Sequence, residues 1–108
     1  MRAKMSNSFV VASAKLTNAV GLHARPSVKL TQLAKSFASD LEVALAPDGP
    51  WLDAKSPVKI MRVKASRGTV LHFRARGADA AAAVASAIQL VERRFDEEDE
   101  AAVGNARG

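Results

Sequence analysis

The stretch Thr69-Val70-Leu71-His72-Phe73-Arg74-Ala75-Arg76 (residues 69–76) decides the fold class of this chain. Side chains along an extended chain point alternately to its two sides. The residues that would face a core are Leu71, Phe73 and Ala75. The residues that would face outward are Val70, His72 and Arg74. This alternation predicts a strand with one buried face, followed by a turn at residues 77–79 and an alanine-rich helix.

The rest of the chain, read outward from this strand, predicts further strands and helices. We expect strands over residues 9–16, 41–46 and 51–53, and helices over 24–37, 57–64 and from about residue 80 to Phe95. The expected inward side chains are Val10, Ala12, Ala14 and Leu16 in the first strand, Leu30, Leu33, Ala34 and Phe37 in the first helix, and Val84, Ala87, Ile88, Val91 and Phe95 in the last helix. The order βαββαβα lacks the regular spacing of parallel strand–helix–strand units. It predicts an α+β fold, with an antiparallel or mixed sheet and helices on one face.

The bulk composition is that of one small globular domain of 108 residues. We expect residues 9–95 to form this domain, between a flexible N-terminus (1–8) and a tail (96–108) that is acidic and then rich in Gly and Ala. The chain has no cysteine, which excludes disulfides and a thiolate nucleophile. No apolar run is long enough to span a bilayer, and no signal peptide is evident. We therefore expect a cytoplasmic protein without membrane insertion.

The net charge of +5 raises the question of nucleic-acid binding. The aromatic residues are four Phe and one Trp, and they do not alternate with basic residues as stacking platforms would. The basic residues are also dispersed along the chain. We therefore expect partners other than nucleic acid.

The segment Gly21-Leu22-His23-Ala24-Arg25-Pro26 joins a loop to the start of the first helix. The first N–H groups of a helix have no partner within it, and the helix dipole adds positive charge there, so this place attracts anions. Neutral imidazole is a competent nucleophile near neutral pH, and the Arg25 guanidinium suits phosphate oxygens. Composition alone favours a simpler alternative, in which His23 is a capping or surface histidine and Arg25 a solvated charge.

Residues 17–26, Thr-Asn-Ala-Val-Gly-Leu-His-Ala-Arg-Pro, resemble the active-site segment of the HPr family. These proteins are the histidine-containing phosphocarriers of the bacterial phosphoenolpyruvate-dependent phosphotransferase system. A second segment, Lys55-Ser56, resembles the regulatory-serine segment of the family, and Ser56 precedes Arg67-Gly68-Thr69 at a similar spacing. The resemblance covers residues 9–95. It implies an open-faced β-sandwich, in which three helices cover one face of a four-stranded antiparallel sheet.

The resemblance also implies a role for each residue of the first segment. His23 would accept a phosphoryl group on Nδ1 from enzyme I and pass it to a IIA-type domain. Arg25 would neutralise the phosphoryl oxygens, and the backbone N–H of Ala24 would complete the cradle. Such a protein is a monomeric carrier rather than an enzyme, and it needs no metal or cofactor. Val20 departs from the family pattern, because this position often holds a polar residue.

An apolar patch with a basic rim is expected beside His23. Its centre would consist of Val28, Pro57, Val58 and Met61, and its rim of Arg25, Lys29, Lys55, Lys59 and Arg62. Such a surface suits acidic partners, and the resemblance implies that enzyme I and IIA domains dock on it. The alternative is that Val58 and Met61 belong to the core.

Ser56 has a structural reason to be present, because Ser followed by Pro marks the start of a helix. The resemblance adds a regulatory reading, in which an HPr kinase phosphorylates Ser56 and the new charge weakens docking. Three departures leave that role open: Pro57 stands where a large aliphatic residue is usual, and Lys59 and Lys64 replace small residues common in the family.

Three functions remain to be separated. The first is a carrier of the sugar or nitrogen-related phosphotransferase system. The second is the HPr-like component of the phosphoryl donor of dihydroxyacetone kinase, which the segment 55–59 also resembles. The third is a regulatory or nucleic-acid-binding module without phosphotransfer.

Overall fold

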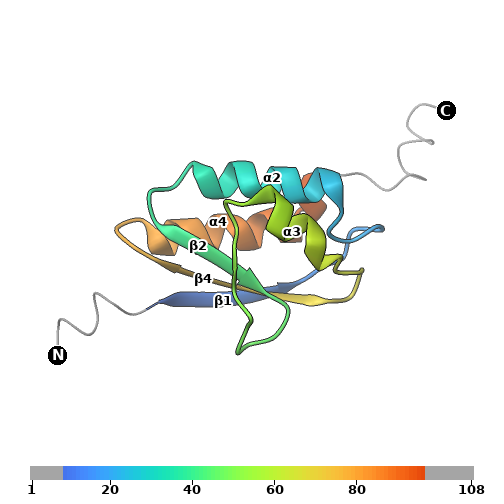
Figure 1. Cartoon of the computed structure of the whole chain (residues 1–108), viewed down its shortest axis with the longest axis horizontal. Helices are drawn as coiled ribbons and strands as arrows, with labels where there is room; N and C mark the ends of the chain where they lie inside the picture. The colour runs from blue at the N-terminus through green and yellow to red at the C-terminus, as the bar shows by residue number, and fades with distance from the viewer. Residues whose placement is uncertain (1–8, 97–108) are drawn as a thin grey trace.

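A computed structural model describes residues 9–96 of the chain. The elements follow the order β-α-β-β-α-β-α, with a short final turn (Figure 1). Their bounds are β1 Val10–Lys15, α2 Ala24–Lys35, β2 Asp40–Ala44, β3 Leu52–Asp53, α3 Pro57–Val63, β4 Val70–Arg76, α4 Ala80–Glu92 and η1 Arg94–Asp96. This order confirms the βαββαβα pattern expected from the sequence.

The four strands form one antiparallel sheet in the order β1-β4-β2-β3. The alternating strand β4 lies between β1 and β2, where Phe73 pairs with Ala12 on one side and Val43 on the other. Leu71, Phe73 and Ala75 are fully buried. β4 therefore occupies an interior position of the sheet with its inward residues buried, and the sheet is antiparallel throughout rather than mixed.

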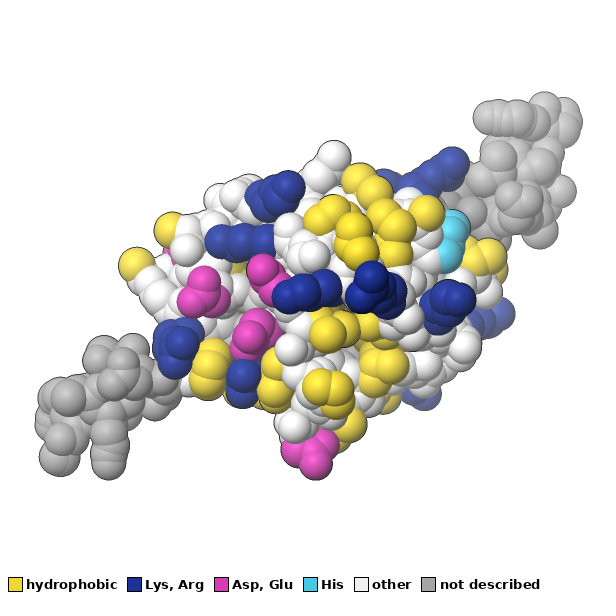
Figure 2. All heavy atoms as spheres, viewed as in Figure 1, with side chains coloured by type: hydrophobic (Ala, Val, Ile, Leu, Met, Phe, Trp, Pro, Cys, Tyr) yellow, Lys and Arg dark blue, Asp and Glu magenta, His cyan; other side chains and the backbone are white. Residues whose placement is uncertain are grey.

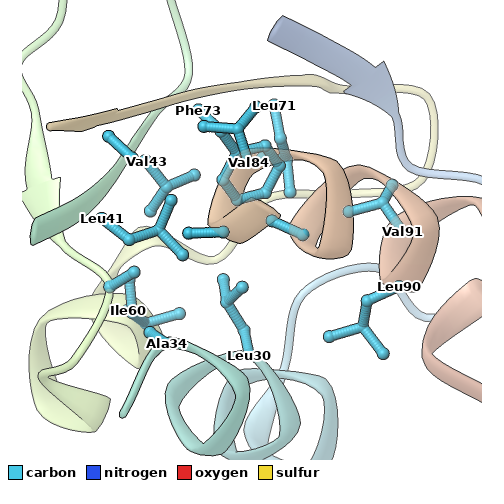
Figure 3. Close-up of a cluster of buried hydrophobic side chains, with 14 of the residues drawn as sticks. Leu30, Ala34, Leu41, Val43, Ile60, Leu71, Phe73, Val84, Leu90 and Val91 are labelled. Carbon is cyan, nitrogen blue, oxygen red and sulfur yellow. The ribbon is translucent and has the colours of Figure 1, made fainter. Parts of the chain in front are cut away.

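All three helices lie on one face of the sheet, with α2 and α4 side by side and α3 next to α2 (Figure 1). Figure 3 shows the core between the layers, where Leu41, Val43 and Phe73 of the sheet meet Leu30 and Val84 of the helices. The fold class is thus the open-faced sandwich implied by the resemblance. The other face of the sheet carries polar side chains, among them half-buried residues such as His72.

The last helix ends earlier than expected. The apolar stripe predicts a helix to Phe95, but α4 ends at Glu92, and residues 94–96 turn with φ of 57° to 60°. This left-handed turn leaves Phe95 fully buried and its carbonyl 2.6 Å from Lys29 Nζ, which donates a hydrogen bond to it. Phe95 therefore reaches the core from a reversed turn rather than from a helix.

Smaller differences occur at other ends. The first helix ends at Lys35 instead of Phe37, and the second strand covers Asp40–Ala44 instead of 41–46. In both cases the periodic apolar residues continue beyond the end of the element into the following turn, so the pattern does not mark where the helix or strand ends. Val10, expected to face inward, is 37% exposed because it lies at the end of an edge strand.

Asp79 connects the start of α4 to the loop that precedes β2. Its carboxylate accepts hydrogen bonds from the Ser39 hydroxyl and from the N–H groups of Ala38 (3.0 Å) and Ser39 (2.8 Å). The Asp79 N–H donates to Ser39 Oγ in return, at 3.1 Å. The Ser39 hydroxyl, followed by these main-chain donors, lowers the pKa of Asp79 below its usual value. The bonds join two loops at the end of the sheet remote from His23.

Candidate functional site

His23 is the N-cap residue of α2, with φ −115° and ψ −158°, and its side chain is exposed. The N-cap position was the one expected from the sequence. The next turn of α2 is anchored, because Pro26 and Ser27 are buried and the Ser27 N–H donates to the His23 carbonyl at 2.9 Å. The helix thus presents the imidazole at its positive end, on a backbone that is held in place.

The loop before His23 is held against the segment that follows α3. The N–H of Leu22 donates to the carbonyl of Ala65 at 2.8 Å, and both residues are buried. Gly21 has φ +70°, and a Cβ on it would overlap the Ala65 carbonyl oxygen. The amide Nδ2 of Asn18 donates to the Gly21 carbonyl at 2.8 Å, which closes the turn. Gly21 is therefore required both for its backbone conformation and for this close approach.

Two open depressions adjoin at His23 and share only His23 and Ala24 among their lining residues. One contains Arg25, Val28, Lys29 and Gln32, all on α2. The other is lined mainly by Val20, Met61, Lys64, Ala65, Ser66 and Arg67. His23 and Ala24 thus form the boundary between the two depressions, which we call the His23 ridge.

The electrostatics of this ridge favour an anion. No acidic side chain lies in the first turn of α2, and Arg25 is exposed in that turn. The first N–H groups of the helix, including that of Ala24, point along the helix axis toward its start. A phosphoryl group on the imidazole would meet helical N–H groups and a guanidinium together. Within residues 9–96, no group of three or more His, Asp or Glu is placed to bind a metal ion.

The expected apolar patch is exposed at the surface. Val28 is 39%, Val58 57% and Met61 37% exposed, so the alternative that Val58 and Met61 belong to the core is wrong. Figure 2 shows hydrophobic side chains gathered over α2 and α3, with Lys and Arg side chains beneath them and a histidine nearby. Pro57 at the start of α3 is half-buried.

The five residues of the basic rim differ in whether their side chains bond to the main chain. Arg25, Lys59 and Arg62 are exposed. Lys29 and Lys55 instead donate from Nζ to main-chain carbonyls, Lys29 to Phe95 at 2.6 Å and Lys55 to Phe37 at 3.1 Å. These two lysines keep their charge near the patch but are tied to the fold.

Ser56 is the N-cap of α3, as expected, and Pro57 is the first residue of that helix. The Ser56 hydroxyl accepts a long hydrogen bond, 3.5 Å, from the N–H of Lys59. The side chain is half-buried beside the patch. Its structural role as a cap is therefore established independently of any modification.

Lys64, Ser66 and Arg67 line the depression beside His23, and the sequence did not identify them as site residues. Lys64 stood out only as a departure from the family pattern, and Arg67 only as part of the segment Arg67-Gly68-Thr69. The sequence does hold one signal, four basic residues in the nine from Lys59 to Arg67. The sequence does not indicate that these residues lie near His23. They are brought there by the hydrogen bond between the Leu22 N–H and the Ala65 carbonyl, which joins two segments distant in the chain.

Over the described residues, 9–96, each helix is too short or too polar to cross a membrane.

Comparison with known proteins gives consistent results. The family model for the PTS HPr component phosphorylation site matches residues 10–93. The phosphocarrier protein HPr of Xylella fastidiosa is 39% identical over 83 residues, which are 77% of this chain and 91% of that protein. The phosphocarrier protein NPr of Escherichia coli is 34% identical over 85 residues, 78% of this chain and 92% of that protein.

Solved structures agree with the sequence relatives. A crystal structure of HPr from Thermoanaerobacter tengcongensis superposes with a TM-score of 0.74 at 34% identity, covering 82% of this chain and 98% of the other. HPr from Bacillus anthracis superposes with a TM-score of 0.71 at 28% identity, covering 79% and 99%. Since the family model spans nearly the whole described domain, this chain belongs to the HPr family of the phosphotransferase system, whose members carry a phosphoryl group without being enzymes.

Proposed function

We propose that His23 is the residue that carries the phosphoryl group, on Nδ1. The observation that supports this most is the exposed imidazole at the N-terminus of α2, on a ridge between two depressions and next to Arg25. Phospho-enzyme I would be the donor and a IIA-type domain the acceptor. His72, the other histidine of the chain, is half-buried within strand β4 on the open face of the sheet, and not at a helix start.

The transfer is a simple exchange of one N–P bond for another. The lone pair of neutral His23 Nδ1 attacks phosphorus, and the donor N–P bond breaks with its electron pair remaining on the donor nitrogen. The proton on Nε2 stays in place, so no other reactant is needed. Arg25 and the Ala24 N–H offset the charge on the three phosphoryl oxygens during the exchange. In the second step a nucleophilic nitrogen of the IIA domain attacks phosphorus, and the N–P bond to His23 breaks with its electron pair returning to Nδ1.

The test is to incubate the protein with enzyme I and labelled phosphoenolpyruvate. Label that is lost in acid and kept in base is expected on the wild type and on the matched variant His72→Ala, and not on His23→Ala. Retention of the label by His23→Ala would refute the assignment. Arg25→Ala should be labelled more slowly while unfolding at the wild-type temperature, and Lys35→Ala, at the other end of α2, should behave as wild type.

The exposed patch of Val28, Pro57, Val58 and Met61, with the rim residues Arg25, Lys29, Lys55, Lys59 and Arg62, is the surface on which we place both partners. An apolar centre within a positive rim suits an acidic protein surface. Met61→Glu should weaken binding to enzyme I with little loss of stability, since Met61 is already 37% exposed. The matched control is Val11→Glu, which adds the same charge at a 61% exposed position of β1. Equal weakening by both variants would count against this surface.

Ser56 is a second place of control within this proposal. A phosphate on Ser56, added by a kinase of the HPr kinase type, would put negative charge beside Val58 and Lys59 and repel acidic partners. Ser56→Asp should therefore slow phosphorylation of His23, whereas Ser56→Ala should not. Equal rates of His23 phosphorylation in Ser56→Asp and Ser56→Ala would contradict control by a negative charge at residue 56. Reconstitution with sugar-specific IIA domains, nitrogen-related IIA domains and the dihydroxyacetone kinase system would assign the branch.

A further inference from the structure

Lys64 has an unusual backbone conformation. It follows α3 with φ 53° and ψ 44°, in the left-handed region that disfavours any residue with a Cβ. Glycine is the ordinary choice for the residue that ends a helix in this way. Strained conformations of this kind are concentrated at functional sites, so the presence of a lysine here calls for a reason in its side chain.

The turn itself has a clear structural purpose. It directs the chain out of α3 so that the carbonyl of Ala65 accepts the hydrogen bond of the Leu22 N–H at 2.8 Å. Lys64 is one residue from this bond on one side, and His23 is one residue from it on the other. The bond therefore fixes the Lys64 backbone close to the His23 backbone.

Lys64 and Arg67 line the same depression as His23. Both residues are exposed, and the other described residues that line the depression are apolar or neutral, apart from His23 itself. These two basic residues thus lie at a depression whose lining includes no acidic residue. Arg25 is absent from this lining and belongs to the depression on the other side of the His23 ridge.

We infer that Lys64 and Arg67 form a second cationic wall of the phosphorylation site and hold the phosphoryl oxygens during transfer, on the side of His23 away from Arg25. This inference rests on the proposed role of His23. The transferring group has its charge spread over three oxygens, so cations on both sides stabilise it better than one alone. The exchange of N–P bonds is the one described above, and the two residues take no part in it as reactants. This contribution to phosphoryl transfer would explain why residue 64 is a lysine although its backbone conformation favours glycine.

The test compares five variants with the control Lys35→Gln: Lys64→Gly, Lys64→Gln, Lys64→Arg, Arg67→Gln and the double variant with Gln at both positions. Transfer from labelled phospho-enzyme I is followed by rapid quench over a range of acceptor concentrations. Each single variant except Lys64→Arg should lower the maximal transfer rate about three- to tenfold, and the double variant more, with little change in the half-saturating concentration. Lys64→Gly should unfold at or above the wild-type temperature, because the strain is relieved. Lys64→Arg should keep the wild-type rate.

Each other outcome overturns the inference in a recognisable way. A wild-type maximal rate in the double variant shows that the two cations do not contact the phosphoryl group. A change confined to the half-saturating concentration shows that they act in docking alone. Slow transfer in Lys64→Gly but not in Lys64→Gln shows that only the backbone matters. Absence of label on His23 in the wild type refutes the proposed function and this inference together, whereas the first three results leave the proposed function intact.

Discussion

Replacement of Gly21 by alanine should be among the most damaging single-methyl changes in this protein. The φ of Gly21 is +70°, where an alanine costs about 1 kcal/mol relative to glycine. Its Cβ would also overlap the Ala65 carbonyl oxygen and lie 3.0 Å from Ser66 Cα, so the two segments must separate. The hydrogen bond from the Leu22 N–H to Ala65 would then lengthen, and leaving this buried donor poorly bonded costs about 1–3 kcal/mol.

The total destabilisation expected for Gly21→Ala is about 3 kcal/mol, which corresponds to a fall in melting temperature of about 12–24 °C for a domain of this size. Gly68→Ala is the matched control. Gly68 has φ +96°, but a Cβ there would meet nothing within 4 Å. It should therefore cost only the conformational strain, about 1 kcal/mol or about 4–8 °C.

Thermal unfolding followed by circular dichroism measures both variants, and phosphoryl transfer from phospho-enzyme I measures the effect on the site. Gly21→Ala should also accept the phosphoryl group more slowly at temperatures where it is folded, because His23 lies two residues beyond the displaced turn. Equal falls in melting temperature for the two variants would refute the argument from close approach. Unchanged transfer in a clearly destabilised Gly21→Ala would show that the turn does not position His23.

Three further predictions concern the stability of the fold. The pKa of Asp79 is lowered in the folded state, so its ionised form stabilises the fold at pH values above the usual carboxyl pKa, and this stabilisation is lost as the pH falls through the lowered pKa. Asp79→Asn should therefore reduce the melting temperature at pH 7. The reduction should become smaller in melts below about pH 4. Ser56→Ala should cost only about 0.5–1 kcal/mol in urea unfolding, because the capping bond is long at 3.5 Å, and a larger loss would mean a stronger cap than the geometry indicates. Leu30→Ala should cost about 2–5 kcal/mol in the same assay, because Leu30 is fully buried between the layers, and a loss under 1 kcal/mol would contradict its place in the core.

The elements were predictable where one period of side chains held over many residues. The alternation in 69–76 identified β4 and its buried face correctly, because side chains in a strand have a period of two whatever surrounds them. The end of the last helix was not predictable in the same way. Phe95 continues the apolar stripe of α4, but it is buried by a left-handed turn that Lys29 supports from another helix. The pattern records which residue is buried, not which backbone conformation buries it.

The same distinction between local and long-range features applies to the candidate site. The positions of His23 and Ser56 at helix starts, with Arg25 in the first turn of α2, were predictable because a helix start is a local feature. The functional roles proposed for these residues rest on the family resemblance instead. Whether Val58 and Met61 belonged to the core or to the surface was undecided, since a short helix has room for either pattern. Their exposure depends on how α3 lies against α2, and that is set by packing.

The sequence by itself determined the order of the elements, the buried face of β4 and the helix start at His23, because each follows from residues that are close together in the chain. Only the tertiary structure decided that the segment 64–67 stands beside His23. That neighbourhood depends on one buried hydrogen bond between Leu22 and Ala65 and on the close approach that Gly21 permits. Contacts between distant segments depend on the packing of the whole domain, and no local period records them.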